Sequence, residues 1–406
     1  MGVKGVRGTY PQWDFRKDGT GARRFANGAP RRAGGDGSLE PVPGRPDLVL
    51  FGAAVALAVL GLMMVFSASY STGMQNYQDP YFFIKRQLAH ATIGALVMMI
   101  TMRIDYRIWR PLALPGLLVA FALLVLVLLI GVEVNGAKAW INLGITNFQP
   151  AEFTKLALIN FTAAYIAYRR GGMRRFWTGL VPPLAVLALA FGLIMLQPDF
   201  GTGVVLLSAI VLMLFAGGAN VGHIAAMGLC GLPVLGYMIY QRPYRLRRIV
   251  SFLDPWKDPL DSGWNIIQSL LAIGSGGLFG LGLGEGRQKF AYLPEQHTDF
   301  IFSVLGEELG FVGTATVLFL FFVIAWRGYR AALTAPDLFG SMLAVGLTSV
   351  ICFQAILNIG VATGSLPVTG VTLPFLSFGG TSLVATFAAV GVLLNISRAG
   401  RSVKGP

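Results

Sequence analysis

Long apolar runs follow one another along most of the chain. Eight of them reach at least about 17 residues, the length that crosses roughly 30 Å of hydrocarbon as a helix, and two weaker runs bring the expected number of spans to ten. The runs are continuously apolar, whereas a membrane strand would alternate over about ten residues. The pattern therefore predicts an all-α integral membrane protein with about ten transmembrane helices. The expected spans are residues 48–68, 86–102, 111–131, 151–168, 180–196, 202–217, 221–240, 300–326, 341–363 and 380–396.

Between the seventh and eighth spans lies the long segment 241–298. Its apolar part, residues 264–286, contains seven glycines, which favours a re-entrant or interfacial segment over a further span. The glycine-rich run matches no phosphate-loop pattern, so nucleotide binding is not supported. Basic residues gather in the amino-terminal tail and in alternate loops, and the positive-inside rule then predicts that both termini are cytoplasmic. Under a ten-span count the segment 241–298 is extracytoplasmic; its seven basic residues are an exception, because the rule weakens for long loops. In the alternative topology, residues 264–286 cross the membrane as a further helix, and the carboxyl terminus is then extracytoplasmic.

These patterns divide the chain into three expected parts. Residues 1–46 carry nine Lys or Arg against four Asp or Glu and predict a disordered basic cytoplasmic tail. Residues 47–397 form the ten-helix domain, and 398–406 form a short cytoplasmic tail. Anionic lipid near the span ends explains the net charge of +13, so no nucleic-acid partner is needed.

Composition narrows the chemistry. Only 13% of residues are charged, about half of what soluble domains use. Cys230 and Cys352 both lie in apolar runs, which predicts buried free thiols and no disulfide framework. The three histidines have no zinc-ligand spacing, so a metal, if used, would be a hard ion held by oxygen atoms.

Charged residues at span boundaries are candidate functional residues, because an ionised side chain at the centre of a membrane helix costs about 2.5–3.5 kcal/mol. Glu152 and Lys155 are spaced i, i+3 and share a helix face; they form either a structural ion pair or part of a polar cavity. Asp199, in the Pro–Gly break LQPDFGTG, either caps the next helix or takes part in chemistry.

The stretch LPEQHTDFIFSVLGEELG, residues 293–310, concentrates carboxylates at the start of the eighth span. Thr298 is expected to be the N-cap, which places Asp299 in the first helical turn, where capping or the helix dipole could explain it. On a continuous helix Glu307 falls within about 80° of the face of Asp299, and Glu308 points away. Two aligned carboxylates predict a polar cavity that reaches inward from the outer surface.

Several separated motifs carry a family resemblance. Four stretches in this order, NGAKAWINLGITNFQPAEFTKLALIN, RRIVSFLDPW, LPEQHTDFIFSVLGEELG and NIGVATGSLPVTGVTLPFLSFGGTSL, resemble the signatures of the SEDS family (shape, elongation, division and sporulation), which includes FtsW, RodA and SpoVE. The resemblance covers about residues 47–397. It implies a peptidoglycan glycosyltransferase of the bacterial cytoplasmic (inner) membrane that polymerises lipid II on the outer face. It also implies a class B penicillin-binding protein and other divisome membrane proteins as partners.

The resemblance assigns roles to particular residues. Asp299 corresponds to the essential Asp of the family's HTDF motif, and Trp140 to the Trp of its NGxxxWI stretch. Ala139 stands where the family usually has Arg, so the role of that Arg passes to Lys138 or is absent. The loop LPVTGVTLPFLSFGG has Thr369 where some division-type members carry Lys, and it resembles sporulation and elongation members. The stretch GEGRQKFAYLPEQHTDF, with GEELG after it, instead resembles division and sporulation members. The division type is the expected subtype.

Glycan polymerisation of this kind needs a base for the acceptor hydroxyl and cations for the diphosphate leaving group. Asp299 is the expected base, and Mg²⁺ held by Asp299, Glu307 or the diphosphate is a candidate cofactor. Two other classes stay open, a lipid II flippase and a non-catalytic divisome scaffold. The expected substrate-binding residues are Trp140, Lys138, Glu152, Lys155, Asp199, Arg245, Arg248 and Glu307, with Arg287 and Lys289 as further candidates for the diphosphate.

Overall fold

The computed structural model describes residues 44–134, 136–144, 146–240, 243–287 and 293–403. Most of the expected tail 1–46 therefore lies outside the described residues, and the disorder of that tail stays a prediction. The described residues form one compact unit. Its long helices are α1 (Leu48–Tyr77), α2 (Phe82–Arg103), α3 (Ala113–Ile130), α4 (Pro150–Tyr168), α5 (Val181–Leu196), α6 (Phe200–Ala216), α7 (Val221–Tyr240), α10 (Ile301–Thr334), α11 (Leu338–Ala362) and α12 (Gly380–Val403).

Each expected apolar run corresponds to one of these long helices. Among the described residues, six helices are long and apolar enough to cross a membrane by length and composition, and the protein is a multi-pass membrane protein. The exact number of ten spans stays a prediction. Cys230 lies on α7 with an exposed side chain and Cys352 is partly buried in α11, so the expectation that both thiols are buried was wrong for Cys230.

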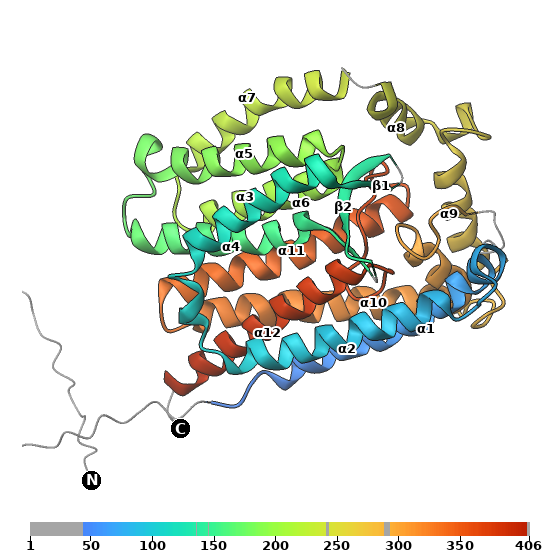
Figure 1. The fold of residues 1–406 in the computed structure, drawn as a ribbon, viewed down its shortest axis with the longest axis horizontal. Helices are drawn as coiled ribbons and strands as arrows, with labels where there is room; N and C mark the ends of the chain where they lie inside the picture. Colours follow the sequence, from blue (N-terminus) through green and yellow to red (C-terminus); the bar gives the residue numbers. More distant parts are fainter. Residues whose placement is uncertain (1–43, 135, 145, 241–242, 288–292, 404–406) are drawn as a thin grey trace, which may run out of the picture. The chain divides into compact units, whose positions relative to one another are not determined.

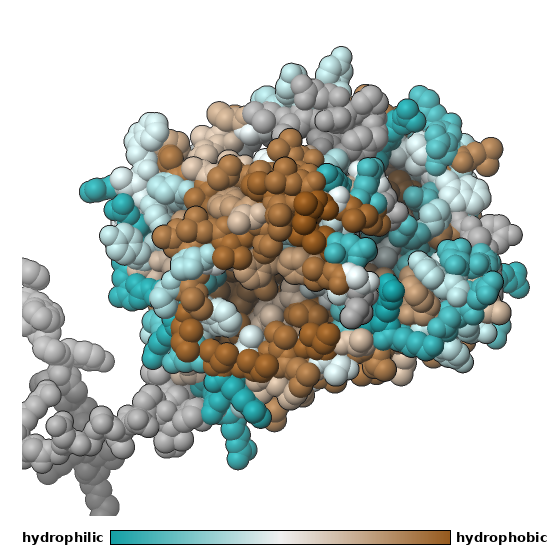
Figure 2. Space-filling model, viewed as in Figure 1, coloured by the Kyte–Doolittle hydropathy of each residue, from teal (hydrophilic) through white to brown (hydrophobic). Residues whose placement is uncertain are grey.

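Two helices form the centre of the bundle. In the most apolar windows of α11 and α12, 72% of the residues are buried inside the protein, against 28% for α3. Helix α12 packs against α2, and α11 packs against α4, α6 and α10 (Figure 1). On the face that Figure 2 shows, hydrophobic side chains cover the middle and hydrophilic ones gather towards its left and right ends. This distribution is that of a bundle with an apolar belt between two polar ends.

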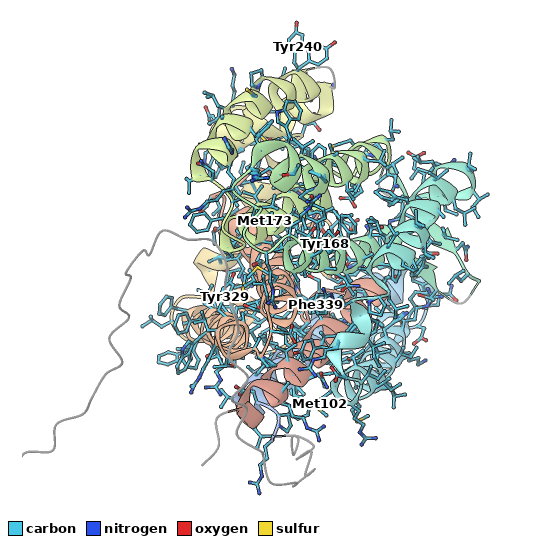
Figure 3. All side chains as sticks on the ribbon, turned by 90° about the vertical axis from the view of Figure 1, so that its left-hand side faces the viewer. Met102, Tyr168, Met173, Tyr240, Tyr329 and Phe339 are labelled. Carbon is cyan, nitrogen blue, oxygen red and sulfur yellow. The ribbon has the colours of Figure 1, made fainter. Side chains whose placement is uncertain are left out.

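The described ends of the chain meet at one end of the bundle. The Arg398 Nε donates a hydrogen bond to the Gly44 carbonyl at 3.0 Å, and the Asp47 amide donates to Ser397 Oγ at 3.2 Å. Figure 3 views this end, where Met102 of α2, Tyr168 of α4 and Phe339 of α11 are labelled. Residues 44–47 and 397–398 therefore lie on the same side of the bundle.

The opposite end, at the right in Figure 1, carries the segment between α7 and α10. It contains the short helices α8 (Pro243–Leu253) and α9 (Trp264–Ser275). The 12 residues of α9 span only about 18 Å at 1.5 Å per residue, too short to cross a bilayer. Ser269 on α9 donates to the Ala362 carbonyl at 2.6 Å and lies 2.5 Å from Ser303 Oγ on α10. The segment thus folds back against the bundle.

A small antiparallel sheet, β1 (Val132–Val134), β2 (Ala137–Asn142) and β3 (Asn147–Phe148), lies at the same end. Its order is β1-β2-β3, with Val132 opposite Trp140 and Ile141 opposite Phe148. The all-α expectation missed this sheet because its strands have at most six residues, too few to give a clear alternating pattern. The sheet places Trp140 and Lys138 beside the end of α3.

Helix α10 is interrupted near its start. Gly310 has φ +65° and ψ −160°, outside the helical region. The glycine-rich stretch after α9 supplies the missing hydrogen bonds: the Leu281 and Gly282 amides donate to the Glu307 and Glu308 carbonyls at 3.0 and 3.1 Å, and the Phe311 amide donates to the Gly277 carbonyl at 2.9 Å. Residues 277–282 of the glycine-rich stretch are therefore a structural partner of the break.

Candidate active site

Asp299 lies in a turn that precedes α10, not on the helix. The helix begins at Ile301, its N-cap is Phe300, and Thr298 Oγ1 donates to the Glu295 carboxylate at 2.8 Å. The expected N-cap at Thr298 and the placement of Asp299 in the first helical turn were therefore wrong. Asp299 must be held by other means than the helix.

Those means are three consecutive carbonyls, each of which accepts a hydrogen bond from elsewhere in the fold. The His297 carbonyl accepts from the Phe378 amide at 2.8 Å, the Thr298 carbonyl from Ser377 Oγ at 2.5 Å, and the Asp299 carbonyl from Asn358 Nδ2 at 2.8 Å. The donors come from α11 and from the loop 364–379. The backbone of the HTDF turn is thereby tied to α11 and to the loop 364–379.

The carboxylate of Asp299 remains available. Among the residues that the structure describes, no hydrogen-bond donor contacts it. Burial raises the pKa of Asp299 to about 7, the negative charges of Glu295 and Asp199 add to this effect, and Arg248 opposes it. A carboxyl group with a pKa near neutrality can both take and release a proton at physiological pH.

Glu152 and Lys155 form the ion pair that was one of their two interpretations, with 2.9 Å between Lys155 Nζ and Glu152 Oε1 and both side chains almost completely buried. Lys155 Nζ also donates to Gln354 Oε1 at 2.8 Å. Gln354 Nε2 in turn donates to the Thr372 carbonyl at 3.1 Å and to Ser382 Oγ at 3.3 Å. The pair is therefore connected through α11 to the loop beside Asp299.

Asp199 caps α6, as the first interpretation of its Pro–Gly break predicted. Its Oδ1 accepts from the Thr202 amide and its Oδ2 from Gln149 Nε2, both at 3.1 Å. Burial raises its pKa, and the charge of Lys155 lowers it. The loop 364–379 runs between Asp199 and Asp299: a Cβ on Gly201 would lie 2.6 Å from the Thr369 carbonyl, and one on Gly370 would lie 3.7 Å from Asp299 Oδ2.

The basic candidates divide into near and distant ones. Arg248 on α8 is exposed, donates to the Val368 carbonyl at 3.2 Å and acts on Asp299 electrostatically. Lys138 Nζ instead donates to the Leu128 carbonyl at 2.9 Å, so it caps the carboxyl end of α3. The Arg287 side chain is exposed, Lys289 lies outside the described residues, and so does the side chain of Arg245.

Glu307 does not join Asp299 on one helical face. Its Oε1 accepts from the Arg287 amide at 2.7 Å, whereas Glu308 accepts from Ser67 Oγ of α1 at 2.6 and 2.7 Å. Both side chains are buried, at 1% and 0% exposure, directly before the break in α10. The expected alignment failed because Asp299 is not on the helix. Glu307 is better described as a hydrogen-bond acceptor for the glycine-rich segment than as a substrate-binding residue.

Comparison with known proteins identifies the family. The model of the FtsW/RodA/SpoVE family, described as "Cell cycle protein", matches residues 47–402. The chain belongs to this family.

The most similar relatives include both division and sporulation proteins. Stage V sporulation protein E of Bacillus subtilis (strain 168) is 50% identical over 88% of this chain and 98% of its own length. The probable peptidoglycan glycosyltransferase FtsW of Trichlorobacter lovleyi is 46% identical over 86% of this chain and 93% of its own. Several further FtsW proteins match at 40–45% identity, which supports the division-type assignment.

Solved structures agree with the fold. A chain in a structure described as "Structural coordination of polymerization and crosslinking by a peptidoglycan synthase complex" has a TM-score of 0.73 at 31% identity, over 87% of this chain and 98% of that one. The rod shape determining protein RodA of Thermus thermophilus has a TM-score of 0.66 at 31% identity, over 87% and 97%. The FtsW/RodA/SpoVE fold therefore extends over nearly the whole described chain.

In this family member, sequence reasoning missed the amides that hold the Asp299 turn. Asn358 and Gln354 lie one helical turn apart in the apolar run 341–363, and both are buried. Two amides at i, i+4 in an otherwise apolar helix are a readable signal, because each needs a buried hydrogen-bond partner. His297 was also missed; it packs between Phe83 and Phe378 at ring-centroid distances of 4.6 and 5.8 Å, and burial lowers its pKa.

Proposed function

We propose that this FtsW/RodA/SpoVE family member is a peptidoglycan glycosyltransferase that polymerises lipid II into glycan strands during cell division. The observation that carries the proposal is the Asp299 carboxylate. It has a pKa raised to about 7, no hydrogen-bond donor among the described residues, and a backbone fixed by three separate donors. The names of the FtsW relatives support the same activity.

The chemistry is a single displacement with inversion. Asp299 takes the proton of the acceptor 4-hydroxyl as its oxygen bonds to the anomeric carbon of the donor sugar. The bond from that carbon to the diphosphate oxygen breaks, and the electron pair leaves with the lipid diphosphate. One step inverts the α link to β, so no covalent intermediate on the protein is needed, as in inverting glycoside hydrolysis.

The leaving diphosphate needs positive charge. Arg248 is the best placed described cation, because it is exposed and acts on Asp299. Lys155 is bound to Glu152 and Gln354. Its charge would therefore act on the diphosphate only across the loop 364–379, without direct contact. Trp140, partly buried on β2, offers an aromatic face to a sugar or to the polyprenyl chain.

A divalent cation such as Mg²⁺ would neutralise the diphosphate in the same way. No group of three or more His, Cys, Asp or Glu that could hold a metal ion occurs in the part of the chain that the structure describes. Because Glu307 is bound to the Arg287 amide, Asp299 is the remaining carboxylate of the expected set. Such an ion would be held chiefly by the phosphate oxygens of the substrate, as Mg²⁺ often is.

Location and partners follow from the proposed activity. The chain would lie in the bacterial cytoplasmic (inner) membrane with both termini in the cytoplasm and the Asp299 site at the outer face. A class B penicillin-binding protein would cross-link the strands, and other divisome membrane proteins would bind alongside. The similarity to a chain of a peptidoglycan synthase complex supports such a partner.

The test is polymerisation of labelled lipid II by the purified full-length protein, with and without a class B penicillin-binding protein. Asp299→Asn keeps the size and polarity of the side chain but takes no proton at neutral pH, so the rate should fall about 10²- to 10⁴-fold. Asp105→Asn is the matched control, because Asp105 caps the short helix η1 (Tyr106–Trp109) by accepting from the Arg107 amide. If Asp299→Asn polymerises at the parental rate, Asp299 is not the base, and a scaffold or flippase becomes the better interpretation.

A further inference from the structure

One buried amide connects the Asp299 turn with the loop that faces it. Asn358, 1% exposed on α11, donates from Nδ2 to two backbone carbonyls, Asp299 at 2.8 Å and Val371 at 2.7 Å. An Asn side chain has two N–H bonds on that nitrogen, and both are used here. The turn and the loop are thus fixed to one point on a central helix.

The oxygen of the same amide, Oδ1, also bears on which way the Asn358 side chain is turned. Asn358 Oδ1 is buried and has no hydrogen-bond partner among the residues that the structure describes. If the amide were flipped, its oxygen would face two carbonyl oxygens and neither could accept a hydrogen bond. The side chain therefore leaves one acceptor without a partner in order to give both donors to the Asp299 and Val371 carbonyls, although buried polar groups are normally satisfied.

Gln354, one turn earlier on α11, extends the connection. It accepts from Lys155 and donates to the Thr372 carbonyl. Residues 371 and 372 of the loop are consequently held by two amides of the same helix. Asn358 lies on the side of Asp299, and Gln354 lies on the side of the Glu152–Lys155 pair.

We propose that Asn358 is a positioning residue for the Asp299 base: by binding the Asp299 and Val371 carbonyls together, it sets where the carboxylate stands relative to the loop 364–379. This inference rests on the proposed function. Asn358 does not touch the reacting atoms and acts only through the backbone of the turn. A displacement of about 1 Å can reduce a positioned catalytic step about 100-fold.

Asn358→Leu tests the proposal, because leucine has nearly the same size and no hydrogen-bonding groups. The kcat of lipid II polymerisation should fall about 10- to 100-fold, and KM should change little, because the substrate contacts remain. The pH profile should change as well. A turn released from α11 exposes Asp299 to solvent, its pKa falls towards the ordinary value, and the acid limb of the profile moves to lower pH.

Burial is the main cause of the raised pKa of Asp299, and Glu295, Arg248 and Asp199 act on it electrostatically. Glu295 and His297 lie on the same turn, Arg248 faces it from α8, and Asp199 faces it from the start of α6. The loop 364–379 contains no titratable side chain. The shift therefore reports the burial of Asp299 and its position relative to these charges.

Asn395→Leu is the matched control for lost packing and stability. Asn395 is also a buried asparagine on a central helix with two backbone bonds, from Nδ2 to the Met102 carbonyl and from the Tyr106 amide to Oδ1, both at 2.9 Å, but at the other end of the bundle. It should lower thermal stability without moving the acid limb. A limb that stays in place in Asn358→Leu, or moves equally in Asn395→Leu, overturns the proposal.

Ser377→Ala is a milder variant for the case that Asn358→Leu is not recovered folded. It removes the bond to the Thr298 carbonyl and should shift the limb in the same direction by a smaller amount; an unchanged limb overturns the proposal. Asp299→Asn, measured in parallel, separates the two hypotheses. If Asp299→Asn is inactive while Asn358→Leu and Ser377→Ala match the parent, the positioning role of Asn358 is wrong and the proposed function stands. If Asp299→Asn is active, the assignment of Asp299 as the base is wrong.

Discussion

At the scale of single residues, Asp299 differs from the other aspartates that lie beside a long helix. Asp47, Asp199 and Asp337 each accept hydrogen bonds from the first turn of α1, α6 and α11, which is the usual duty of an Asp at that place. Asp299 has no such bond, and the N-cap of α10 is Phe300. Its carboxylate is thus not explained by capping, which strengthens the assignment as a base.

The pH dependence of polymerisation should follow from the pKa of Asp299, about 7. A base works only when ionised, so kcat/KM should be level above pH 7 and fall about tenfold per unit below it. Glu295→Gln should move this acid limb to lower pH, because the Glu295 charge raises the pKa of Asp299. The measurement is the initial rate between pH 5 and 9. An acid limb near pH 4 in the parent protein would contradict the assignment.

At the scale of elements, the break in α10 is the feature with the strictest backbone requirements. Gly280 has φ +79°, and a Cβ on it would lie 2.1 Å from the Glu308 carbonyl oxygen; Gly310 has φ +65°, and a Cβ there would lie 2.3 Å from the Gly280 amide nitrogen. Only glycine permits both the left-handed conformation and this close approach. The break places two buried carboxylates, Glu307 and Glu308, directly beside the glycine-rich segment.

Gly280→Ala should destabilise the protein by about 1–2 kcal/mol from the left-handed backbone alone, with more from the contact to Glu308. Gly274→Ala is the matched control on α9, where a Cβ meets nothing within 4 Å, and it should be neutral or slightly stabilising, because alanine favours a helix over glycine. Thermal unfolding in detergent measures both. Equal melting temperatures for the two variants would show that the segment does not support α10.

The same elements show what the sequence could predict. Apolar runs, the cap at Asp199 and the Glu152–Lys155 pair are local, because each depends on residues within about four positions. The runs were predicted, and the cap and the ion pair were each one of two interpretations. The break at Gly310 was not predicted, because its hydrogen bonds come from residues 277–282. The expected alignment of Asp299 with Glu307 was wrong for a different reason: α10 begins only at Ile301, so Asp299 lies in the turn before the helix. The bonds of Asn358 to residues 299 and 371 also join distant segments, and no local pattern encodes them.

At the scale of the whole molecule, the two polar ends of the bundle carry different groups of residues. One end gathers residues 44–47 and 397–398, where the buried Arg327 guanidinium pairs with Asp47. The other end holds Asp299, Asp199 and Arg248 around the loop 364–379. An apolar belt separates them (Figure 2). A cytoplasmic position of both termini therefore places the proposed active site at the outer face, as the proposed function requires.

Thiol labelling tests this orientation. The background is a protein in which Cys230 and Cys352 are replaced by Ala; it should keep near-normal activity, because Cys230 is on the exposed face of α7 and neither thiol has a proposed role. Leu260→Cys, at a position 84% exposed between α8 and α9, should react with a membrane-impermeant reagent on intact spheroplasts. Arg170→Cys, exposed after α4, should react only after permeabilisation. The reverse labelling pattern would show the opposite orientation in the membrane. Asp299 would then lie on the cytoplasmic side, where it could not act on lipid II at the outer face.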